Sequence, residues 1–541
     1  MDPVPLTPYP DHTMNTFKNF GSFKRVVEET SVDAVPSPWN NVFRYITDTK
    51  RFPAYRRGIL RQTQLFDPFV NTALKQFDDE LHSAIKGKTR APGDEWDVYE
   101  RLTKYDQPEL HFPEDERFRL CYNSALAQVM KEFKLNRPVV PHWIMDVDLV
   151  KNTSSGFPHF MRKGDILDQV KSEARSHFHL LKRLPLWRAP LLPCVPATRG
   201  GLADITAPKT RLVWMYPGAM TAIEAVFAQP LIYHLFREKE EYLITGVDTK
   251  FRIQRYLSLI SDEMGTLGIG LDFKSFDTLR CNWIIRDAFD VLKQNIYFNG
   301  YFDDINGLQT FGDAKASRLE HAWNNIVEYF IHTPIILPNG RCVSKHIGVP
   351  SGSHFTNLID SIITRLLIRT FSLYEQIPIR SLRTNGDDSA FLASDTYCGD
   401  IILKASIFFR KFVGMTVNTD KSCIAGLPSE MHISGTTWLG LRPTRSTEEW
   451  MMLAAYGETY SRIPFDSFQR LLGLGLAGGF GNSTFTQFFD YFQSGYDCRH
   501  GPNLLNWKKL RFLQNVFGID DLPLVYKQGA RTTLRLRLLV S

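Results

Sequence analysis

The sequence predicts an α/β (α+β) protein in which a small antiparallel sheet is backed by helices. Apolar side chains alternate with glycine and aspartate over residues 267–273, which is the period of a strand. An Asn-Gly pair at 385–386 lies between two strand-like runs and indicates a hairpin. Between these two regions, Leu358, Ile362 and Leu366 recur at helical spacing.

Length and composition are those of a large globular protein. The chain has 541 residues, which allows one large enzyme or about three or four domain-sized units. With 43% hydrophobic and 23% charged residues, collagen-like, coiled-coil and mostly disordered classes are excluded. We find no run of about 18 apolar residues and no basic-then-apolar start. We therefore expect neither a membrane span nor secretion.

Cysteine usage and net charge narrow the class further. Seven cysteines are an odd number without a CxxC pair, which argues against a disulfide framework and against structural zinc. A reducing compartment is the simpler interpretation. The net charge of +6 fits a nucleic-acid partner, but it also fits many enzymes that have none.

The first 150 residues are predicted to be mainly helical. Two sets of apolar residues lie on predicted helical faces: Leu74, Phe77, Leu81 and Ile85, and then Phe118, Cys121, Leu126, Met130 and Phe133. Six basic residues against the single acid Asp204 then follow between 182 and 211. This segment is a candidate to face phosphate, and a solvated basic loop is the alternative.

Two pairs of acids are the candidate chemistry. Asp272 lies on the glycine side of the predicted strand, and Asp277 follows near the strand end. Asp387 and Asp388 follow the Asn-Gly turn, where adjacent carboxylates repel unless a cation lies between them. Exposed strand ends and polar turns are the structural alternatives. If both pairs converge, oxygen ligands without His or Cys favour Mg²⁺ or Mn²⁺, and two such ions serve in-line phosphoryl transfer.

A polar loop lies between the two acid pairs. Gly348, Pro350 and Gly352 are predicted to fix this loop before a helix. Small hydrogen-bonding side chains crowd the helix start: Ser351, Ser353, Thr356, Asn357 and Asp360. Such a surface can bind a sugar or a phosphate, although a well-capped helix explains the same residues.

In this order, the segments resemble the palm of a viral RNA-dependent RNA polymerase of the double-stranded RNA partitivirus and picobirnavirus group. The resemblance spans most of residues 151–440. Motif G of the family matches Thr153, Ser154, Ser155 and Gly156, and motif F matches Arg199, Lys209 and Arg211. Motif A matches Asp272 and Asp277, and motif B matches Ser351, Gly352, Thr356 and Asn357. Motif C matches Asp387 and Asp388, and motif D matches Lys421. Residues 437–443 resemble the motif E turn.

The resemblance implies a role for each match. Asp272 and Asp387 would hold two Mg²⁺ or Mn²⁺ ions with support from Asp388, and Lys421 would be a catalytic acid. The motif F cations, Asp277 and the motif B residues would bind the NTP. Residues 153–156 would bind the template. Asp360 occupies a position where plus-strand polymerases usually have Asn, which puts a simple transfer of the ribose-selecting role in question.

The resemblance also implies a right hand with fingers, palm and a mainly helical thumb. We expect an N-terminal extension at 1–150 bridging fingers and thumb, fingers at 151–268 with an insertion at 296–344, palm at 269–295 and 345–440, and thumb with a C-terminal tail at 441–541. The expected partners are RNA template and product, NTPs and a viral capsid protein, with no membrane. The expected location is the host cytoplasm, inside the virion.

Two other functions remain open from the sequence. A reverse transcriptase shares the carboxylates, but it usually has an aromatic residue before the two acids, where this chain has Asn385-Gly386. A nonenzymatic RNA-binding virion protein would explain the basic segments but has no use for converging carboxylates. The sequence therefore favours template-directed RNA synthesis.

Overall fold

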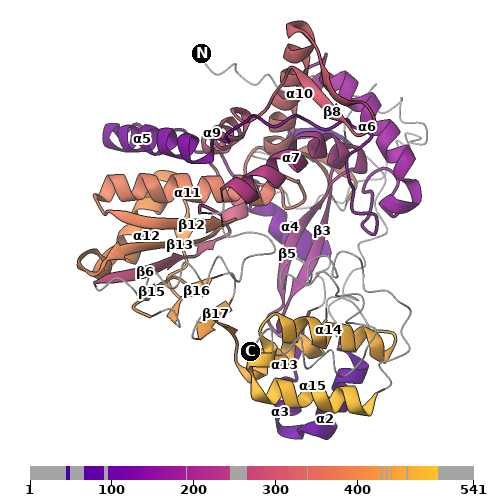
Figure 1. Cartoon of the computed structure of the whole chain (residues 1–541), viewed down its shortest axis with the longest axis vertical. Coiled ribbons are helices and arrows are strands. Elements are labelled where there is room, and N and C mark those ends of the chain that lie inside the picture. Colours follow the sequence, from indigo (N-terminus) through magenta and orange to yellow (C-terminus); the bar gives the residue numbers. More distant parts are fainter. Residues whose placement is uncertain are drawn as a thin grey trace.

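The computed structural model describes most of the chain between residues 66 and 496. The described residues are 44–48, 66–90, 95–189, 192–239, 241–243, 265–337, 339–427, 430–433, 436–439, 442–457 and 461–496. Residues 497–541, the last part of the expected thumb and C-terminal tail, lie outside them. Figure 1 shows a sheet-and-helix half beside a helix-rich upper part, with a separate helical bundle below.

A four-stranded antiparallel sheet, in the order β12-β13-β6-β15, is the centre of the first part. Its strands are β6 (Thr266–Leu271), β12 (Ile379–Asn385), β13 (Asp388–Ser394) and β15 (Cys423–Ala425). Ile269 of β6 is paired with Phe391 on one side and with Ile424 on the other. The predicted alternating strand is therefore confirmed as a central strand. It is followed by the short strand β7 (Phe273–Lys274), which pairs with β14 (Thr416–Val417).

Helix α11 (Thr356–Glu375) packs on β12 and β13, and three further helices pack on α11. They are α5 (Glu116–Phe133), α9 (Asn282–Lys293) and α12 (Ile401–Val413). Figure 1 shows α11 along β12 and β13, with α5 above α11. The α5 face differs from the prediction, because Tyr122, Ala125 and Val129 are buried while Cys121 is only half-buried. The stripe is rotated because the Tyr122 ring packs on Trp283 of α9.

The upper and central part of the view in Figure 1 combines helices with short β-hairpins. Its elements are α4 (Glu95–Thr103), α6 (Leu167–Leu181), β3 (Val195–Gly201), β5 (Lys209–Met215), α7 (Gly218–Glu238), β8 (Gly300–Asp303), β9 (Gly307–Thr310), α10 (Asp313–Ile331), β10 (Pro334–Ile336) and β11 (Arg341–Ser344). The N-terminal strand β1 (Arg44–Asp48) pairs with β11, and β2 (Lys88–Thr89) pairs with β4 (Ala203–Asp204).

Helix α7 is long and apolar enough to cross a membrane by length and composition. It is not an uninterrupted apolar run, because Glu224 lies within it, and the expectation of no membrane span stays a prediction. Most of its most apolar stretch, 72%, is buried inside the protein, where Ile223, Phe227 and Leu231 are fully enclosed. The core helix of a soluble protein passes the same length and hydropathy test, and the buried residues of α7 belong to the main hydrophobic core.

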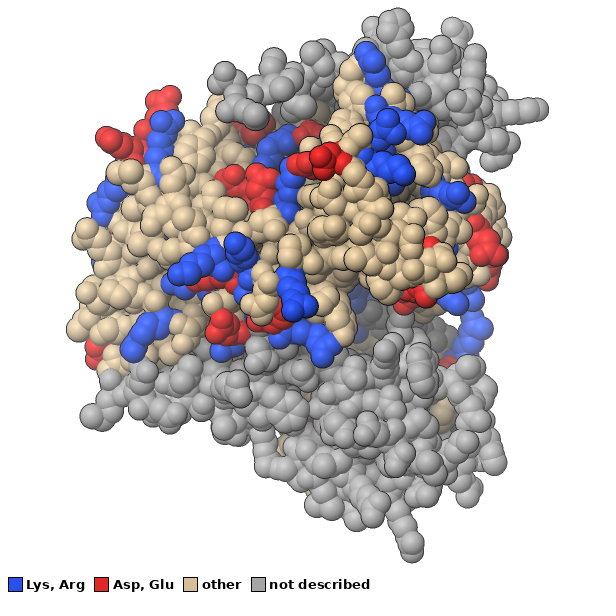
Figure 2. Space-filling model, turned by 45° about the horizontal axis from the view of Figure 1, so that its top comes forward, with Lys and Arg blue, Asp and Glu red and all other residues tan. Residues whose placement is uncertain are grey.

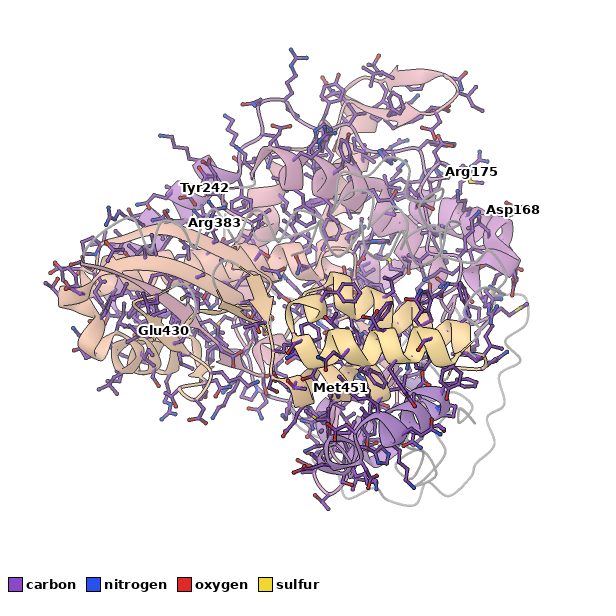
Figure 3. All side chains as sticks on the ribbon, turned by 60° about the horizontal axis from the view of Figure 1, so that its bottom comes forward. Asp168, Arg175, Tyr242, Arg383, Glu430 and Met451 are labelled. Atoms are coloured by element: carbon purple, nitrogen blue, oxygen red, sulfur yellow. The ribbon has the colours of Figure 1, made fainter. Side chains whose placement is uncertain are left out.

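The lower bundle joins segments from both ends of the chain. It contains α13 (Thr447–Ala455), α14 (Pro464–Leu476) and α15 (Ser483–Gly495), together with α2 (Pro68–Phe77) and α3 (Asp79–Ala84). Figure 3 shows Met451 where the yellow C-terminal helices meet the purple N-terminal ones. The predicted face over 74–85 is split between α2 and α3, because Asp78 ends one helix and its carboxylate caps the next at Leu81 N.

A small three-stranded sheet links the palm-like sheet to the bundle. Its strands are β16 (His432–Ile433), β17 (Thr436–Leu439) and β18 (Arg442–Thr444), paired antiparallel in that order. Charge is dispersed on the face shown in Figure 2, where basic and acidic side chains alternate with large uncharged areas. Among the described residues on that face, the basic side chains therefore form no single continuous patch.

Candidate active site

Strand pairing brings the two predicted acid pairs to one end of the sheet. Leu271 of β6 lies opposite Ser389 of β13, and the Ser389 hydroxyl donates to the Leu271 carbonyl at 3.3 Å. Asp272 and Asp388, the next residues outward, therefore leave the ladder at the same end of the sheet. The sequence left open whether the two acid pairs converge. The register of β6 and β13 brings them to the same end of the sheet.

The hairpin turn is displaced by one residue from the predicted position. Asn385 pairs with Asp388, so the turn residues are Gly386 and Asp387 rather than Asn385 and Gly386. Gly386 has a φ of +62°, which glycine adopts without strain. Helix α11 holds the turn, because Ser361 Oγ accepts from Gly386 N at 2.8 Å and Thr364 Oγ1 donates to Gly386 O at 3.0 Å. Asp387 is thus presented on a supported turn.

Asp272 is held by two residues to which the sequence assigned no role, Asn418 and Ser422. Asn418 Nδ2 donates to Asp272 Oδ2 at 2.7 Å, and the Asn418 amide donates to the Asp272 carbonyl at 2.7 Å. Ser422 Oγ accepts from the Asp272 amide at 3.1 Å. The same turn includes Lys421, whose amide donates to the Asn418 carbonyl. Both residues lie in the motif D segment, so the only available signal was their nearness to Lys421 in sequence.

The acids lie within electrostatic reach of one another. Burial raises the pKa of Asp387, and the charges of Asp272 and Asp277 raise it further, against the opposing effect of Arg211. Burial, then Asp387 and Asp277, also raise the pKa of Asp360 well above its usual range. Such mutual repulsion favours a bound cation. Among the described residues, however, no group of three or more His, Cys, Asp or Glu side chains is close enough to form a ready-made metal site.

A cleft of about 510 Å³ connects the motif B loop to the hairpin turn. Its lining includes most of the predicted sugar-facing residues and two of the predicted metal ligands: Ser351, Gly352, Ser353, His354, Thr356, Asn357, Asp360, Asn385, Gly386, Asp387 and Asp388. Asn357 Nδ2 donates to Asn385 Oδ1 at 3.0 Å, which ties the start of α11 to the hairpin. Thr356 instead donates its hydroxyl to the carbonyl of Pro350 at 2.7 Å.

The motif B loop packs too closely on β5 for a larger residue at 352. A Cβ on Gly352 would lie 1.9 Å from the carbonyl oxygen of Trp214. The loop is also held from α7 by Glu224, a fully buried residue that was not predicted as a site residue. Glu224 Oε2 accepts from Ser353 Oγ at 2.8 Å and from His354 N at 2.9 Å.

Cations face the acids from the β3–β5 hairpin. Arg199 pairs with Arg211, and Gly201 with Lys209, in the antiparallel register. Partial burial lowers the pKa of Lys209, and the charges of Lys421 and Arg211 lower it further, whereas Asp272 raises it. Lys209, Arg211 and Lys421 therefore converge near the acids. Arg199 lies exposed on the adjacent strand.

The predicted template residues form a loop against the start of α7. Gly218 N donates to Ser155 O at 2.6 Å, and a Cβ on Gly156 would lie 2.5 Å from Tyr216 O. Ser155 and Gly156 are buried, whereas Thr153 is exposed and Ser154 partly so. Template contact from side chains is thus open to the first two residues only, while the other two shape the loop.

Asp277 lies on a short turn after β7, where Ser275 adopts a φ of +55°. Its carboxylate accepts a hydrogen bond from Tyr105 at 2.7 Å. Tyr105 comes from the N-terminal region and was not predicted as a site residue. Burial and the Asp277 charge raise the pKa of Tyr105 well above its usual range, so the phenol stays protonated and is the donor.

Comparisons with known proteins agree with this arrangement. The family model described as viral RNA-dependent RNA polymerase matches residues 72–456. The chain is 25% identical over 336 residues to the RNA-directed RNA polymerase of Cryptosporidium parvum virus 1, covering 60% of this chain and 59% of the relative. It is 25% identical over 221 residues to that of White clover cryptic virus 1, covering 38% and 35%. Each match thus spans less than two thirds of the relative's length.

Solved structures share the fold. The RNA-dependent RNA polymerase of a human picobirnavirus superposes with a TM-score of 0.58 at 16% identity, covering 94% of each chain. Sicinivirus 3Dpol superposes with a TM-score of 0.60 at 12% identity, covering 88% of this chain and all of that one. At these identities the likeness concerns the fold, and it confirms the predicted right-hand architecture.

Proposed function

This chain belongs to the viral RNA-dependent RNA polymerase family, and we propose that it copies RNA templates into RNA from the four NTPs. The 3′-hydroxyl of the growing strand loses its proton to water, and its oxygen attacks the α-phosphorus of the NTP and forms a new P–O bond. The bond from that phosphorus to the bridging oxygen breaks, and pyrophosphate leaves. We propose that this synthesis replicates and transcribes a double-stranded RNA genome.

The observation that carries the proposal is the meeting of acids and cations from separate elements. Asp272 follows β6, Asp387 lies on the β12–β13 turn, and the charge of Asp272 raises the pKa of Asp387. Arg211 from the β3–β5 hairpin acts on the same carboxylate. A protein that transfers a phosphoryl group from a triphosphate needs carboxylates and cations in the same site. A protein that only binds RNA needs the cations alone.

Members of the family generally use divalent metal ions. The chemistry of the site fits them, because its mutually repelling carboxylates offer hard oxygen ligands without His or Cys. We infer two Mg²⁺ or Mn²⁺ ions held by Asp272 and Asp387 with support from Asp388. When bound, such ions activate the attacking oxygen and stabilise the leaving one.

The remaining residues bind, orient and transfer a proton. Lys209 and Arg211, with Arg199 beside them, neutralise the triphosphate as charge moves toward the leaving group. Lys421 donates a proton to the pyrophosphate. The ribose lies over the cleft lined by Ser351, Asn357 and Asp360, with Asp277 beside the loop, while Thr153 and Ser154 contact the template.

One assay separates this function from its rivals. Purified protein is given Mg²⁺, an RNA template and either the four NTPs or the four dNTPs, and labelled product is examined on a gel. An RNA polymerase extends with NTPs, a reverse transcriptase extends with dNTPs, and a nonenzymatic RNA-binding protein yields no product. Extension confined to dNTPs, or none with any metal, would refute the proposal.

We further propose that the protein works with a viral capsid protein, packaged inside the virion in the host cytoplasm. The support is membership of a family whose relatives are polymerases of viruses. Gradient fractionation of infected cells tests it, because polymerase activity should sediment with capsid protein. Activity found only in capsid-free fractions would contradict packaging.

A further inference from the structure

A segment N-terminal to the polymerase motifs is hydrogen-bonded to the segment that follows Asp272. The amide of Leu110 donates to the carbonyl of Arg280 at 2.9 Å, and Arg280 Nε donates to the carbonyl of Pro108 at 2.8 Å. Trp283 Nε1 then donates to the carbonyl of Leu110 at 3.1 Å. Residues 108–110 are therefore fixed against residues 280–283.

This attachment carries Tyr105 into the site. Its side chain is 1% exposed, and its ring meets that of Trp214 edge to face at 5.1 Å between centroids. The hydroxyl donates to Asp277 Oδ2 at 2.7 Å. Trp214 belongs to the strand that carries Arg211, so the tyrosine is wedged between the cationic hairpin and Asp277.

The loop before α11 completes the enclosure of Asp277. Val349 N donates to the carbonyl of Asp277 at 2.8 Å. Gly348, with a φ of +80°, approaches so closely that a Cβ there would lie 2.5 Å from the same carbonyl and 2.8 Å from the Tyr105 ring. The backbone of Asp277 is thus held by one element and its carboxylate by another. Among the described residues, no hydrogen bond engages Oδ1 of Asp277.

We propose that Tyr105 is a positioning residue for sugar discrimination, which fixes the Asp277 carboxylate by one oxygen and leaves the other for the ribose 2′-hydroxyl. The inference rests on the proposed polymerase function. A carboxylate free to rotate pairs less selectively, because water can replace the missing hydroxyl of a dNTP. A fixed carboxylate left unpaired by a dNTP penalises that substrate.

The test is Tyr105→Phe, which removes only the hydroxyl. The quantity measured is the ratio of kcat/KM for an NTP to that for the matching dNTP, with wild type and variant in parallel. We expect the ratio to fall about tenfold. Partial unfolding reduces the active fraction equally for both substrates, so it leaves this ratio unchanged.

Tyr122→Phe is the matched control. Tyr122 Oη donates to Asp287 Oδ2 at 2.6 Å, again between the N-terminal region and a neighbouring helix, but Asp287 lies on α9 away from the cleft. The ratio should stay at the wild-type value in this variant. An equal fall in both variants, or a Tyr105→Phe ratio within about twofold of wild type, would overturn the inference.

A double-mutant cycle with Asp277→Ala shows whether Tyr105 acts through that carboxylate. Once Asp277 is gone, Tyr105→Phe should lower the ratio no further. A full additional tenfold fall would contradict the positioning role. Failure of wild type to incorporate any NTP would instead refute the proposed function, so the two failures are distinguishable.

Discussion

Glu224 and Ser353 are joined by a 2.8 Å hydrogen bond between a fully buried carboxylate and the loop at the mouth of the cleft. The second carboxylate oxygen of Glu224 is buried without a hydrogen bond among the described residues. Burial raises the pKa of Glu224 to about 8, although its bonds from Ser353 and His354 act in the opposite direction. A neutral, protonated Glu224 therefore belongs to the folded state near neutral pH.

The first prediction follows from that proton. The ordinary pKa of a glutamate side chain is 4.5, and that of Glu224 in the folded state is about 8. Between these two pH values the folded state keeps a proton that the unfolded chain has lost. The free energy of unfolding should therefore fall as pH rises through this window, by up to about 1.4 kcal/mol per pH unit. Glu224→Gln should flatten the dependence when unfolding by urea is measured from pH 5 to 8. Glu430→Gln, at an exposed glutamate, should leave the slope unchanged.

The second prediction concerns the metal ligands. Asp387→Asn removes a charge that Asp272 and Asp277 repel, so the melting temperature should rise while RNA synthesis falls at least about 10²-fold. Mg²⁺ should raise the melting temperature of wild type but not of the variant. Asp272→Asn should likewise abolish synthesis, Asp388→Asn should have a smaller effect, and Asp400→Asn, at an exposed helix start, should have none. Near-normal incorporation by Asp387→Asn would contradict the two-metal assignment.

The third prediction separates proton donation from charge neutralisation. Lys421→Arg keeps the charge, but the pKa of an arginine side chain is too high for ready proton donation. Single-turnover incorporation should therefore slow, with NTP affinity little changed. Lys209→Ala removes a cation near Asp272 and should weaken NTP affinity as well. Rapid-quench measurements across pH distinguish the two. Wild-type rates in Lys421→Arg at every pH would show that the lysine is a bystander.

The fourth prediction concerns the sugar-facing lining. Asn357 donates to Asn385 across the cleft, so Asn357→Ala should both loosen the hairpin contact and raise dNTP use relative to NTP use. Asp277→Ala should have the same effect on the ratio. Asn324→Ala, at an exposed position of α10, is the control. If the kcat/KM ratio is unchanged in both cleft variants, these residues do not line the ribose.

The fifth prediction concerns the lower bundle, in which N-terminal and C-terminal helices pack together. Asp67 is fully buried, caps α2, and accepts through Oδ2 from Ser461, Ser467 and Arg470 at 2.5 to 2.8 Å. Asp67→Ala should destabilise the protein by about 3–5 kcal/mol, because it leaves the arginine without its buried partner. Asp78→Ala, which removes only the cap of α3, should cost about 1 kcal/mol. Thermal unfolding compares them, and equal effects would contradict the network role of Asp67.

Local patterns in the sequence were sufficient for the elements that carry the chemistry. The alternation before Asp272 predicted β6, and the Asn-Gly pair predicted the β12–β13 hairpin to within one residue. The polar loop at 348–356 predicted the start of α11. These features depend on backbone preferences of neighbouring residues, and such preferences are readable from a few positions at a time.

The sequence by itself thus determined which acids, cations and small polar residues are available, and the order in which strand, loop and hairpin present them. Only the tertiary structure decided their partners. Tyr105 reaches Asp277, Glu224 reaches Ser353 and Asn418 reaches Asp272 across more than a hundred residues of chain. Each bond exists because packed elements bring distant segments together, and no local periodicity encodes which segments those are.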